Sequence, residues 1–467
     1  MKFGGTSVGD ASCIARATQI VAQAAREKAV VVVVSAMSGM TNRLVEAANR
    51  AGSGDREAGS ALIAELRRQH AAALSALVSD ETRRAVITSA LDEIFAEGQR
   101  LLDGTALLRE LTPRALDAIS SLGERLCAPI FASALAELGV KTRAIAATEL
   151  IVTDTFHGGA EPRMDRTRAC CEATLRPLLN ETCVPVVTGF IGATPDGVLT
   201  TLGRGGSDYS ATILGAALDV DEVIIWTDVD GVLTGDPRLV PDARTIPEIS
   251  YREAAELAYF GAKVLHPATI LPAVQKSIPV WVLNSRNAEN EGTKITAMAP
   301  KCASPFKSIA AKKRLTIIDI VASRMLMSHG YLKAVFDVFD KYKCAIDMVS
   351  TSEVSISLSV DSNERLPEIC AELARIADVK MEGHKALVCL VGEDIRGHNG
   401  IAARVFTAVS HVNLRMISQG ASEINMSFMI DEEDVEEAVR SLHGVFFADP
   451  DATVFDVDAR VQLESKA

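Results

Sequence analysis

Residues 30–41 read Val-Val-Val-Val-Val-Ser-Ala-Met-Ser-Gly-Met-Thr, a β-branched run followed by a glycine-containing turn. Such a run is typical of a strand that is buried on both faces of a parallel sheet. Comparable runs lie at 184–187, 223–226 and 279–283. The stretches between them carry apolar residues at helical spacing. This alternation predicts an open, mainly parallel α/β sheet with helices on both sides.

We expect the first domain to span residues 1–298. Residues 43–138 show only helical patterns, so we interpret them as a helical insertion in the sheet. Residues 299–314 are rich in Lys, Ala, Ser and Pro and show no periodicity, which predicts a linker.

After this linker the sequence repeats itself. Gly330–Phe336 matches Gly400–Phe406, and Ser352–Leu358 matches Ser422–Phe428 at the same offset. The first copy reads strand, helix, strand, strand, beginning near residue 315. Two copies indicate a duplicated ferredoxin-like α/β domain rather than a solenoid, although chance similarity is the alternative. We place the copies at 315–385 and 386–460, and strand exchange between them is compatible with the pattern.

The charge balance argues against some classes of partner. The 467 residues include 48 Lys and Arg against 61 Asp and Glu, a formal net charge of −13. An acidic chain binds nucleic acid and anionic membranes poorly, so we expect neither as a partner. If the substrate is an anion, positive charge must be concentrated locally, since screening limits the reach of a charge to about 8 Å.

Cysteine usage and hydropathy point to the reducing cytosol. The nine cysteines form no CxxC pair and no zinc spacing, which argues against a disulfide framework. The longest purely aliphatic stretch, 29–34, is far shorter than the roughly 20 residues that cross a bilayer. We therefore expect a soluble, cytoplasmic protein.

Common nucleotide signatures are missing from the sequence. It has no GxxxxGK[ST] motif, and its glycine-rich run at 203–208 lacks the last glycine of a dinucleotide fingerprint. Lys2-Phe3-Gly4-Gly5 offers another arrangement, because glycines let a backbone approach an anion and the lysine adds a mobile charge. A plain strand-to-helix turn is the alternative for this segment.

Gly203-Arg204-Gly205-Gly206-Ser207-Asp208 is a stronger candidate. Its arginine has a planar fork that suits a carboxylate or a phosphate, and Asp208 is placed to hold a lysine. A flexible hairpin with a capped helix is the alternative.

Two later segments follow a predicted strand or helix. The aspartates after Thr227 lie where ligands of open α/β sheets bind, but a solvated turn explains them equally well, so no metal ligand is assigned. Lys263 lies two residues after Gly261. It could be a second phosphate-binding lysine, or a cation that stabilises the negative C-terminal end of a helix dipole.

Taken in order, these motifs resemble those of aspartate kinases. They are KFGGTS (2–7), SAMSGMT (35–41), GERL (123–126), GRGGSD (203–208), WTDVDGV (226–232), DPR (236–238) and FGAKVLHP (260–267). The resemblance covers essentially the whole chain. It implies the amino-acid kinase fold followed by two ACT regulatory domains, without a fused homoserine dehydrogenase.

The resemblance also implies an activity and a set of roles. The reaction is the phosphorylation of the β-carboxylate of L-aspartate by ATP with Mg²⁺, the first step towards lysine, threonine and methionine. Lys2, Asp208 and Lys263 would be catalytic. The aspartate site would comprise Ser35, Thr41, Glu124, Arg204 and Ser207. The ATP site would comprise Lys2, Gly4, Gly5, Thr227, Asp228, Arg238, Lys263 and Val264.

The duplicated tail resembles lysine-sensitive members of the family. The matching effector positions are Met327, Gly330, Tyr331, Leu332, Ile346, Asp347, Ser352 and Glu353. The acidic residues Asp347 and Glu353 suit a diamino acid, which favours L-lysine over threonine as the effector. Because ACT domains generally pair across chains, a homodimer or a dimer of dimers is expected.

Two departures and two alternatives complete this interpretation. Leu233 stands where some relatives have tyrosine, and Gly159 where some have arginine. One alternative is another kinase of the same fold, acting on acetylglutamate, glutamate or carbamate. The other is an inactive amino-acid sensor that uses only its tail, against which the retained Lys2, Lys263 and Asp208 argue.

Overall fold

The computed structural model describes residues 1–448 and Phe455, except 262–264, 301–304, 322–329 and 421. It divides the chain into two compact units. The first comprises 1–232, 248–251 and 264–299, and the second comprises 233–247, 252–263 and 300–467.

This division differs from the predicted boundary at residue 298. Residues 233–247 and 252–263 group with the C-terminal part of the chain. The reason is a set of long-range bonds to the segment that follows residue 305. Ser308 Oγ donates to the carbonyl of Leu233 (2.7 Å), and the N–H of Ile309 donates to the carbonyl of Thr234 (2.9 Å). Composition along the chain carries no sign of such contacts.

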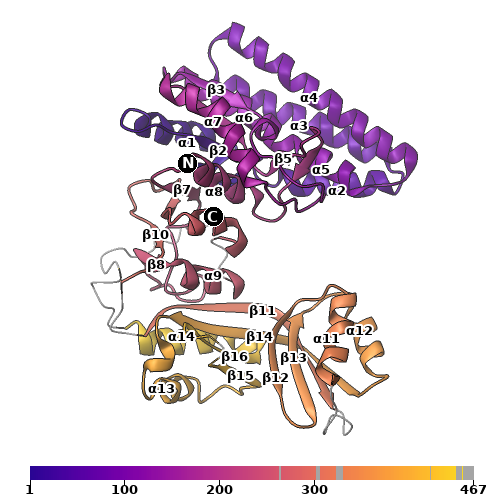
Figure 1. Cartoon of the computed structure of the whole chain (residues 1–467), viewed down its shortest axis with the longest axis vertical. Coiled ribbons are helices and arrows are strands. Elements are labelled where there is room, and N and C mark those ends of the chain that lie inside the picture. Colours follow the sequence, from indigo (N-terminus) through magenta and orange to yellow (C-terminus); the bar gives the residue numbers. More distant parts are fainter. Residues whose placement is uncertain (262–264, 301–304, 322–329, 421, 449–454, 456–467) are drawn as a thin grey trace. The chain divides into compact units, whose positions relative to one another are not determined.

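The first unit is built on an eight-stranded sheet of order β3-β4-β2-β1-β7-β9-β10-β8, shown with its helices in Figure 1. Every pair is parallel except β9 with β10. The strands are β1 Lys2–Phe3, β2 Val32–Val34, β3 Thr142–Ile145, β4 Val184–Thr188, β7 Val223–Thr227, β8 Glu248–Ser250, β9 Val280–Asn284 and β10 Thr293–Thr296. The predicted fold class is confirmed, since every predicted β-branched run forms one of these strands.

Helices surround this sheet. Between β2 and β3 the chain forms only helices, and the two longest of these, α3 and α4, lie side by side (Figure 1). The helices of the unit are α1 Ala11–Ala24, α2 Met40–Gly52, α3 Arg56–Leu77, α4 Glu81–Leu108, α5 Pro113–Ser120, α6 Leu122–Glu137, α7 Met164–Asn180, α8 Gly206–Leu218 and α10 Leu271–Gln275. A separate hairpin pairs β5 Ile191–Ala193 with β6 Leu199–Thr201.

Short β1 is the centre of the sheet. Lys2 lies opposite Val33 on one side and Ile225 on the other. The ring of Phe3 is fully buried and stacks on Trp226 with 6.0 Å between ring centroids. Packing of this kind stabilises a two-residue strand that has little intrinsic stability.

The second unit contains a six-stranded antiparallel sheet of order β12-β13-β11-β14-β16-β15. Two of its strands are unusually long. The elements are α9 Tyr251–Tyr259 (whose first residue belongs to the first unit), β11 Phe306–Val321, α11 Tyr331–Lys341, β12 Ile346–Thr351, β13 Ser355–Asp361, α12 Leu366–Leu373, β14 Asp378–Gly392, α13 Ile401–Ala408, β15 Met416–Gln419, β16 Asn425–Asp431 and α14 Val435–Phe446.

The long strands β11 and β14 are shared between the two repeats. Residues 306–312 of β11 pair with the end of β14, whereas residues 315–321 pair with both β13 and the start of β14. Residues 306–314, predicted to belong to a linker, are therefore strand, and that prediction is wrong for them. The buried Lys307 and the lysines that follow conceal the alternation typical of a strand.

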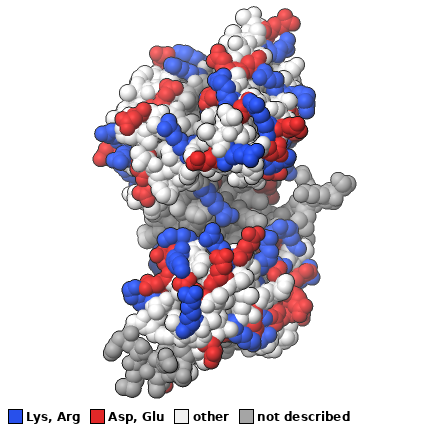
Figure 2. Space-filling view, turned by 90° about the vertical axis from the view of Figure 1, so that its right-hand side faces the viewer, with Lys and Arg blue, Asp and Glu red and all other residues white. Residues whose placement is uncertain are grey.

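Two further observations concern membrane-spanning helices and surface charge. None of the described helices combines the length and apolar character needed to cross a bilayer. On the face drawn in Figure 2, basic and acidic side chains are interspersed rather than gathered into a basic stripe.

Candidate active site

A cavity of about 420 Å³ opens in the first unit. Five segments line it: the start of the chain at β1, the turn between β2 and α2, the first turn of α6, the turn between β4 and β5, and the glycine-rich turn before α8. The lining residues are Lys2, Gly5, Ser35, Ala36, Met37, Gly39, Thr41, Asn42, Glu124, Phe190, Gly203, Arg204, Gly205, Gly206, Ser207 and Asp208. The cavity thus brings together all of the predicted aspartate-site residues with Lys2 and Asp208.

Lys2 and Asp208 form an ion pair at this cavity. The Lys2 ammonium lies 2.6 Å from a carboxylate oxygen of Asp208, and the two side chains are 9% and 16% exposed. Gly4 makes room for that ammonium, because a Cβ at this position would lie 3.2 Å from Lys2 Nζ. The pair fixes a positive charge where the sheet ends, as the glycine-rich motifs predict.

The turn before α8 depends on its glycines. Gly203 and Gly205 adopt left-handed φ angles of 76° and 69°. A Cβ on Gly206 would lie 2.6 Å from the ring of Phe190. α8 begins at Gly206 with no side-chain cap bond in this described segment, so the capped helix of the alternative interpretation is not observed. Backbone N–H groups at such a start favour negative charge.

Arg204 is the exposed cation of this turn. Among the residues that the structure describes, no carboxylate forms an ion pair with its guanidinium, in contrast to Lys2. An arginine with a free planar fork at a cavity wall can bind a carboxylate through two hydrogen bonds.

Glu124 supplies a carboxyl group at the same cavity. Its side chain is buried, and within the described part of the chain its Oε2 has no hydrogen-bond partner. Burial raises the pKa of Glu124 to about 8, although backbone hydrogen bonds, first of all from Ala36, and the positive charge of nearby Lys2 act in the opposite direction. An incoming ammonium group would offset this burial and favour the ionised form.

The turn between β2 and α2 is held tightly against Glu124. A Cβ on Gly123 would come within 2.5 Å of Ala36 Cβ, so only glycine permits this approach. Ser35 continues the β2 ladder by donating its N–H to the carbonyl of Phe3 (3.1 Å). Ser35 and Thr41 thereby face the same cavity as Ser207.

Two residues that line the cavity, Asn42 and Phe190, were not predicted from the sequence. Asn42 follows Thr41 directly and could have been found from that neighbour. Phe190 has a left-handed φ of 71°, which is rare for an aromatic residue and leaves no trace in the sequence.

Lys2 lines the cavity, and the other predicted ATP-site residues fall into three groups. Gly4 and Gly5 follow β1, and Thr227 and Asp228 lie at the carboxyl end of the neighbouring parallel strand β7. Arg238 belongs to the second unit, where its guanidinium pairs with Asp236 at 2.6 Å. Lys263 and Val264 lie outside the described residues. No group of three or more His, Cys, Asp or Glu suited to a metal ion occurs in the described chain.

Four of the predicted effector residues lie at the two ends of one strand. Ile346 and Asp347 begin β12, whereas Ser352 and Glu353 follow its end. At a rise of about 3.3 Å per residue, Asp347 and Ser352 are separated by roughly 16 Å along the strand. Gly330 directly precedes α11, Tyr331 and Leu332 begin it, and Met327 lies outside the described residues.

Among these effector residues, Asp347 has a buried side chain with a cation beside it. Its side chain is 3% exposed, and one oxygen accepts a bond from Lys312 Nζ at 2.8 Å. The other oxygen has no hydrogen-bond partner among the residues described. A buried carboxylate with spare acceptor capacity can bind a further ammonium group.

Comparison with known proteins gives a consistent result. Residues 1–284 match the amino acid kinase family, and residues 388–446 match an ACT domain. The chain is 38% identical to aspartokinase 1, chloroplastic, of Arabidopsis thaliana, over 99% of this chain and 82% of the relative. It superposes on E. coli aspartokinase III in complex with aspartate and ADP with a TM-score of 0.83, at 35% identity, over 96% of this chain and 99% of the other. The same E. coli enzyme in complex with lysine and aspartate gives 0.81 at 36% identity, over 96% and 98%.

Proposed function

The chain belongs to the aspartokinase family, and from this we propose that it transfers the γ-phosphoryl group of ATP to the β-carboxylate of L-aspartate. The product is 4-phospho-L-aspartate. Aspartate kinase activity is the first step of the aspartate pathway, which leads to lysine, threonine and methionine.

One observation carries this proposal: Lys2, Arg204 and Glu124 line the same cavity. Arg204 has the geometry to bind the α-carboxylate of the substrate, and Glu124 has the charge to bind its ammonium. Ser35, Thr41 and Ser207 are placed to complete the hydrogen bonding. A substrate that lacks a free ammonium leaves the Glu124 carboxyl buried without a counter-ion, which favours L-aspartate over acetylglutamate.

The chemistry needs charge neutralisation more than acid–base catalysis. The side-chain carboxyl of aspartic acid, with an ordinary pKa of about 4, is ionised at neutral pH, so no general base has to create the nucleophile. The barrier arises from bringing an anionic amino acid against a polyanionic nucleotide. Lys2, held by Asp208, would neutralise the transferred phosphoryl group, and Lys263 is proposed to assist it.

The nucleotide is proposed to bind at the carboxyl ends of β1 and β7. Gly4 and Gly5 would admit its phosphates, and Thr227 and Asp228 would contact the nucleoside, with Arg238 and Val264 as further ATP contacts. Mg²⁺ bound to the phosphates would supply further charge neutralisation. Because Mg²⁺ is commonly held by substrate phosphates, waters and one or two carboxylates, a dedicated protein cage is not required.

L-Lysine is the proposed feedback inhibitor. The lysine complex of the similar E. coli enzyme supports this assignment, as do the buried carboxylate of Asp347 and the charge of Glu353. Since the two ends of β12 are too far apart for one lysine molecule to reach both, we propose that two chains pair through their ACT domains to complete each site. A homodimer or a dimer of dimers would satisfy this requirement.

A hydroxylamine trap tests the activity. Purified protein is incubated with MgATP, hydroxylamine and, separately, L-aspartate, N-acetyl-L-glutamate, L-glutamate or carbamate. Hydroxamate from L-aspartate alone supports the proposal. Product from another acid would assign a different kinase of this fold, and no product from any acid would favour an amino-acid sensor.

A further inference from the structure

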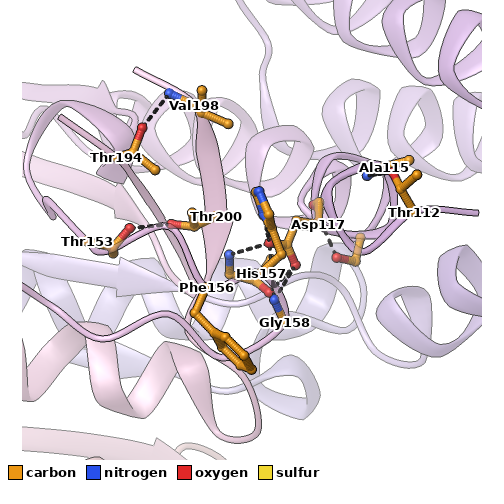
Figure 3. Close-up of polar contacts among 12 residues, drawn as sticks. Thr112, Ala115, Asp117, Thr153, Phe156, His157, Gly158, Thr194, Val198 and Thr200 are labelled. Atoms are coloured by element: carbon orange, nitrogen blue, oxygen red, sulfur yellow. Dashed lines mark hydrogen bonds and ion pairs between the residues drawn. The ribbon is translucent and has the colours of Figure 1, made fainter. Parts of the chain in front are cut away.

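A buried carboxylate outside the cavity gathers donors from two separate segments. Asp117, on α5, has a side chain that is 2% exposed. It accepts hydrogen bonds from His157 Nδ1 (2.7 Å) and from the N–H of Gly158 (3.1 Å), as Figure 3 shows. It also accepts bonds from Thr201 Oγ1 (2.6 Å) and from the N–H of Thr201 (3.3 Å). A carboxylate this deeply buried requires such a set of donors.

Both segments lead to the substrate cavity. Thr201 ends β6, two residues before Gly203 and three before Arg204. The loop that carries His157 and Gly158 lies against the same turn, because a Cβ on Gly203 would be 3.2 Å from the carbonyl oxygen of Gly158. The N–H of Ala160 also donates to the carbonyl of Thr201 (2.8 Å). Through its bonds to Thr201 and to the 157–158 loop, Asp117 therefore holds the segments that lie next to the turn carrying Arg204.

Asp117 is also linked, through its backbone, to the helix that carries Glu124. The backbone carbonyl of Asp117 accepts from the N–H of Ser121 (3.0 Å), at the junction where α5 gives way to α6. Glu124 lies in the first turn of α6. One residue thus connects the helix that carries the candidate ammonium-binding group with the turn that carries the candidate carboxylate-binding group.

Amino-acid recognition depends on the spacing between these two groups. Arg204 is exposed on a turn with two left-handed glycines, so its own backbone provides little rigidity. A displacement of about 1 Å between binding groups is enough to weaken a site that holds both ends of a small ligand. Charge-assisted bonds to a buried carboxylate are well suited to fix such spacing.

We infer that Asp117 is a positioning residue for the aspartate site, which sets the spacing of Arg204 and Glu124 through Thr201 and the 157–158 loop. The inference rests on the proposed aspartate kinase activity. Asp117 itself does not line the cavity, so its effect on the substrate is indirect.

Adjacent residues of β6 provide a matched test. Thr201→Val removes the hydroxyl that bonds Asp117. Thr200→Val, one position earlier, removes a buried hydroxyl that instead bonds Thr153 Oγ1 (2.7 Å; Figure 3). Both threonines are buried, so the two substitutions make similar demands on packing. Asp117→Asn is the third variant, and steady-state kinetics with melting temperatures are measured for all three.

We expect Asp117→Asn and Thr201→Val to raise the KM for L-aspartate by about tenfold or more, with kcat and the KM for ATP within about twofold of wild type. Thr200→Val should leave all three parameters within about twofold. Combining Asp117→Asn with Thr201→Val should add little, because both remove the same connection.

An unchanged KM for L-aspartate in Thr201→Val, or an equal rise in Thr200→Val, would overturn the inference. If Asp117→Asn does not fold, Thr201→Val decides the question alone. Failure of the proposed function is recognised separately, since wild type would then form no hydroxamate from L-aspartate.

Discussion

The ammonium of Lys2 and the carboxylate of Asp208 lie 2.6 Å apart although 205 residues separate them in the sequence. The parallel pairing of β1 with β7, and the packing of α8 nearby, make this meeting possible. The pair holds a lysine in place at the cavity while leaving both groups partly accessible. It also explains why two glycine-rich motifs far apart in the chain serve one site.

Lys2→Met should reduce kcat by about 10²–10³-fold, because it removes a preorganised charge from the transferring phosphoryl group. The KM for L-aspartate should change by no more than about threefold. The matched control is Lys28→Met, whose ammonium pairs with Glu222 on the surface at 2.8 Å. Steady-state kinetics measure both variants, and an equal loss of kcat in the control would contradict a catalytic role for Lys2.

Substrate binding should release a proton at Glu124. The pKa of this buried carboxyl is raised to about 8, so at pH 7 it is mostly protonated in the free enzyme. Binding of the substrate ammonium favours ionisation, so close to one proton should be released per aspartate at pH 7. Calorimetric titration in buffers of different ionisation enthalpy measures this number. Glu124→Gln should bind aspartate weakly and release none, whereas unchanged release would assign the proton to another group.

The raised pKa of Glu124 should also make folding stability depend on pH. Between about pH 4.5 and pH 8 the unfolded chain loses this proton while the folded, unliganded protein keeps it, so folding stability falls as pH rises. Glu124→Gln removes this dependence. The melting temperature of Glu124→Gln minus that of wild type should therefore increase between pH 5 and pH 8. A constant difference over this range would mean that Glu124 ionises normally in the folded protein.

A buried ion pair in the second unit should be important for stability. Lys307 and Glu253 lie 3.0 Å apart with side chains that are 1% and 2% exposed. Lys307→Met should lower the free energy of unfolding of this unit by about 3–5 kcal/mol, because it leaves a buried carboxylate without this ammonium. Lys333→Met, which breaks the exposed pair with Asp337, should change it by less than about 1 kcal/mol. Denaturant unfolding compares the two, and equal effects would contradict the argument from burial.

L-Lysine should inhibit the wild-type enzyme but not Glu353→Ala. The control is Glu364→Ala, which removes another exposed glutamate from the same repeat outside the predicted effector set. Initial rates over a range of lysine concentrations provide the measurement, and all three proteins should have similar rates without lysine. A wild-type enzyme that is indifferent to lysine would remove the effector assignment.

The predictable parts of this molecule are those encoded locally. The run that forms β2 is continuous and β-branched, so it predicts a buried strand without reference to the rest of the chain. The glycines of 203–206 likewise predict a turn that only glycine tolerates, and two of them adopt left-handed angles. Family resemblance then links these local signals to one cavity.

The parts that escaped prediction depend on long-range contacts. Lys307 resembles a linker residue in the sequence, because its partner Glu253 is 54 positions earlier. Asp117 resembles an ordinary helix residue, because its donor Thr201 is 84 positions away. A single sequence shows the residue types but not these partners, so neither the β11 strand nor the positioning carboxylate could be read from it.

The central claim is that the β-carboxylate of L-aspartate, bound in this cavity, attacks the γ-phosphorus of ATP. The most direct test follows one oxygen atom of that carboxylate from substrate to product. L-Aspartate labelled with ¹⁸O in its carboxylates is incubated with MgATP and the enzyme, and the product is observed by ³¹P NMR. Attack by the β-carboxylate held in this cavity predicts an acyl phosphate whose phosphorus resonance is shifted by one bridging ¹⁸O, with the signal lost in Arg204→Ala. Inorganic phosphate as the only product, or an acyl phosphate without the shift, would contradict it.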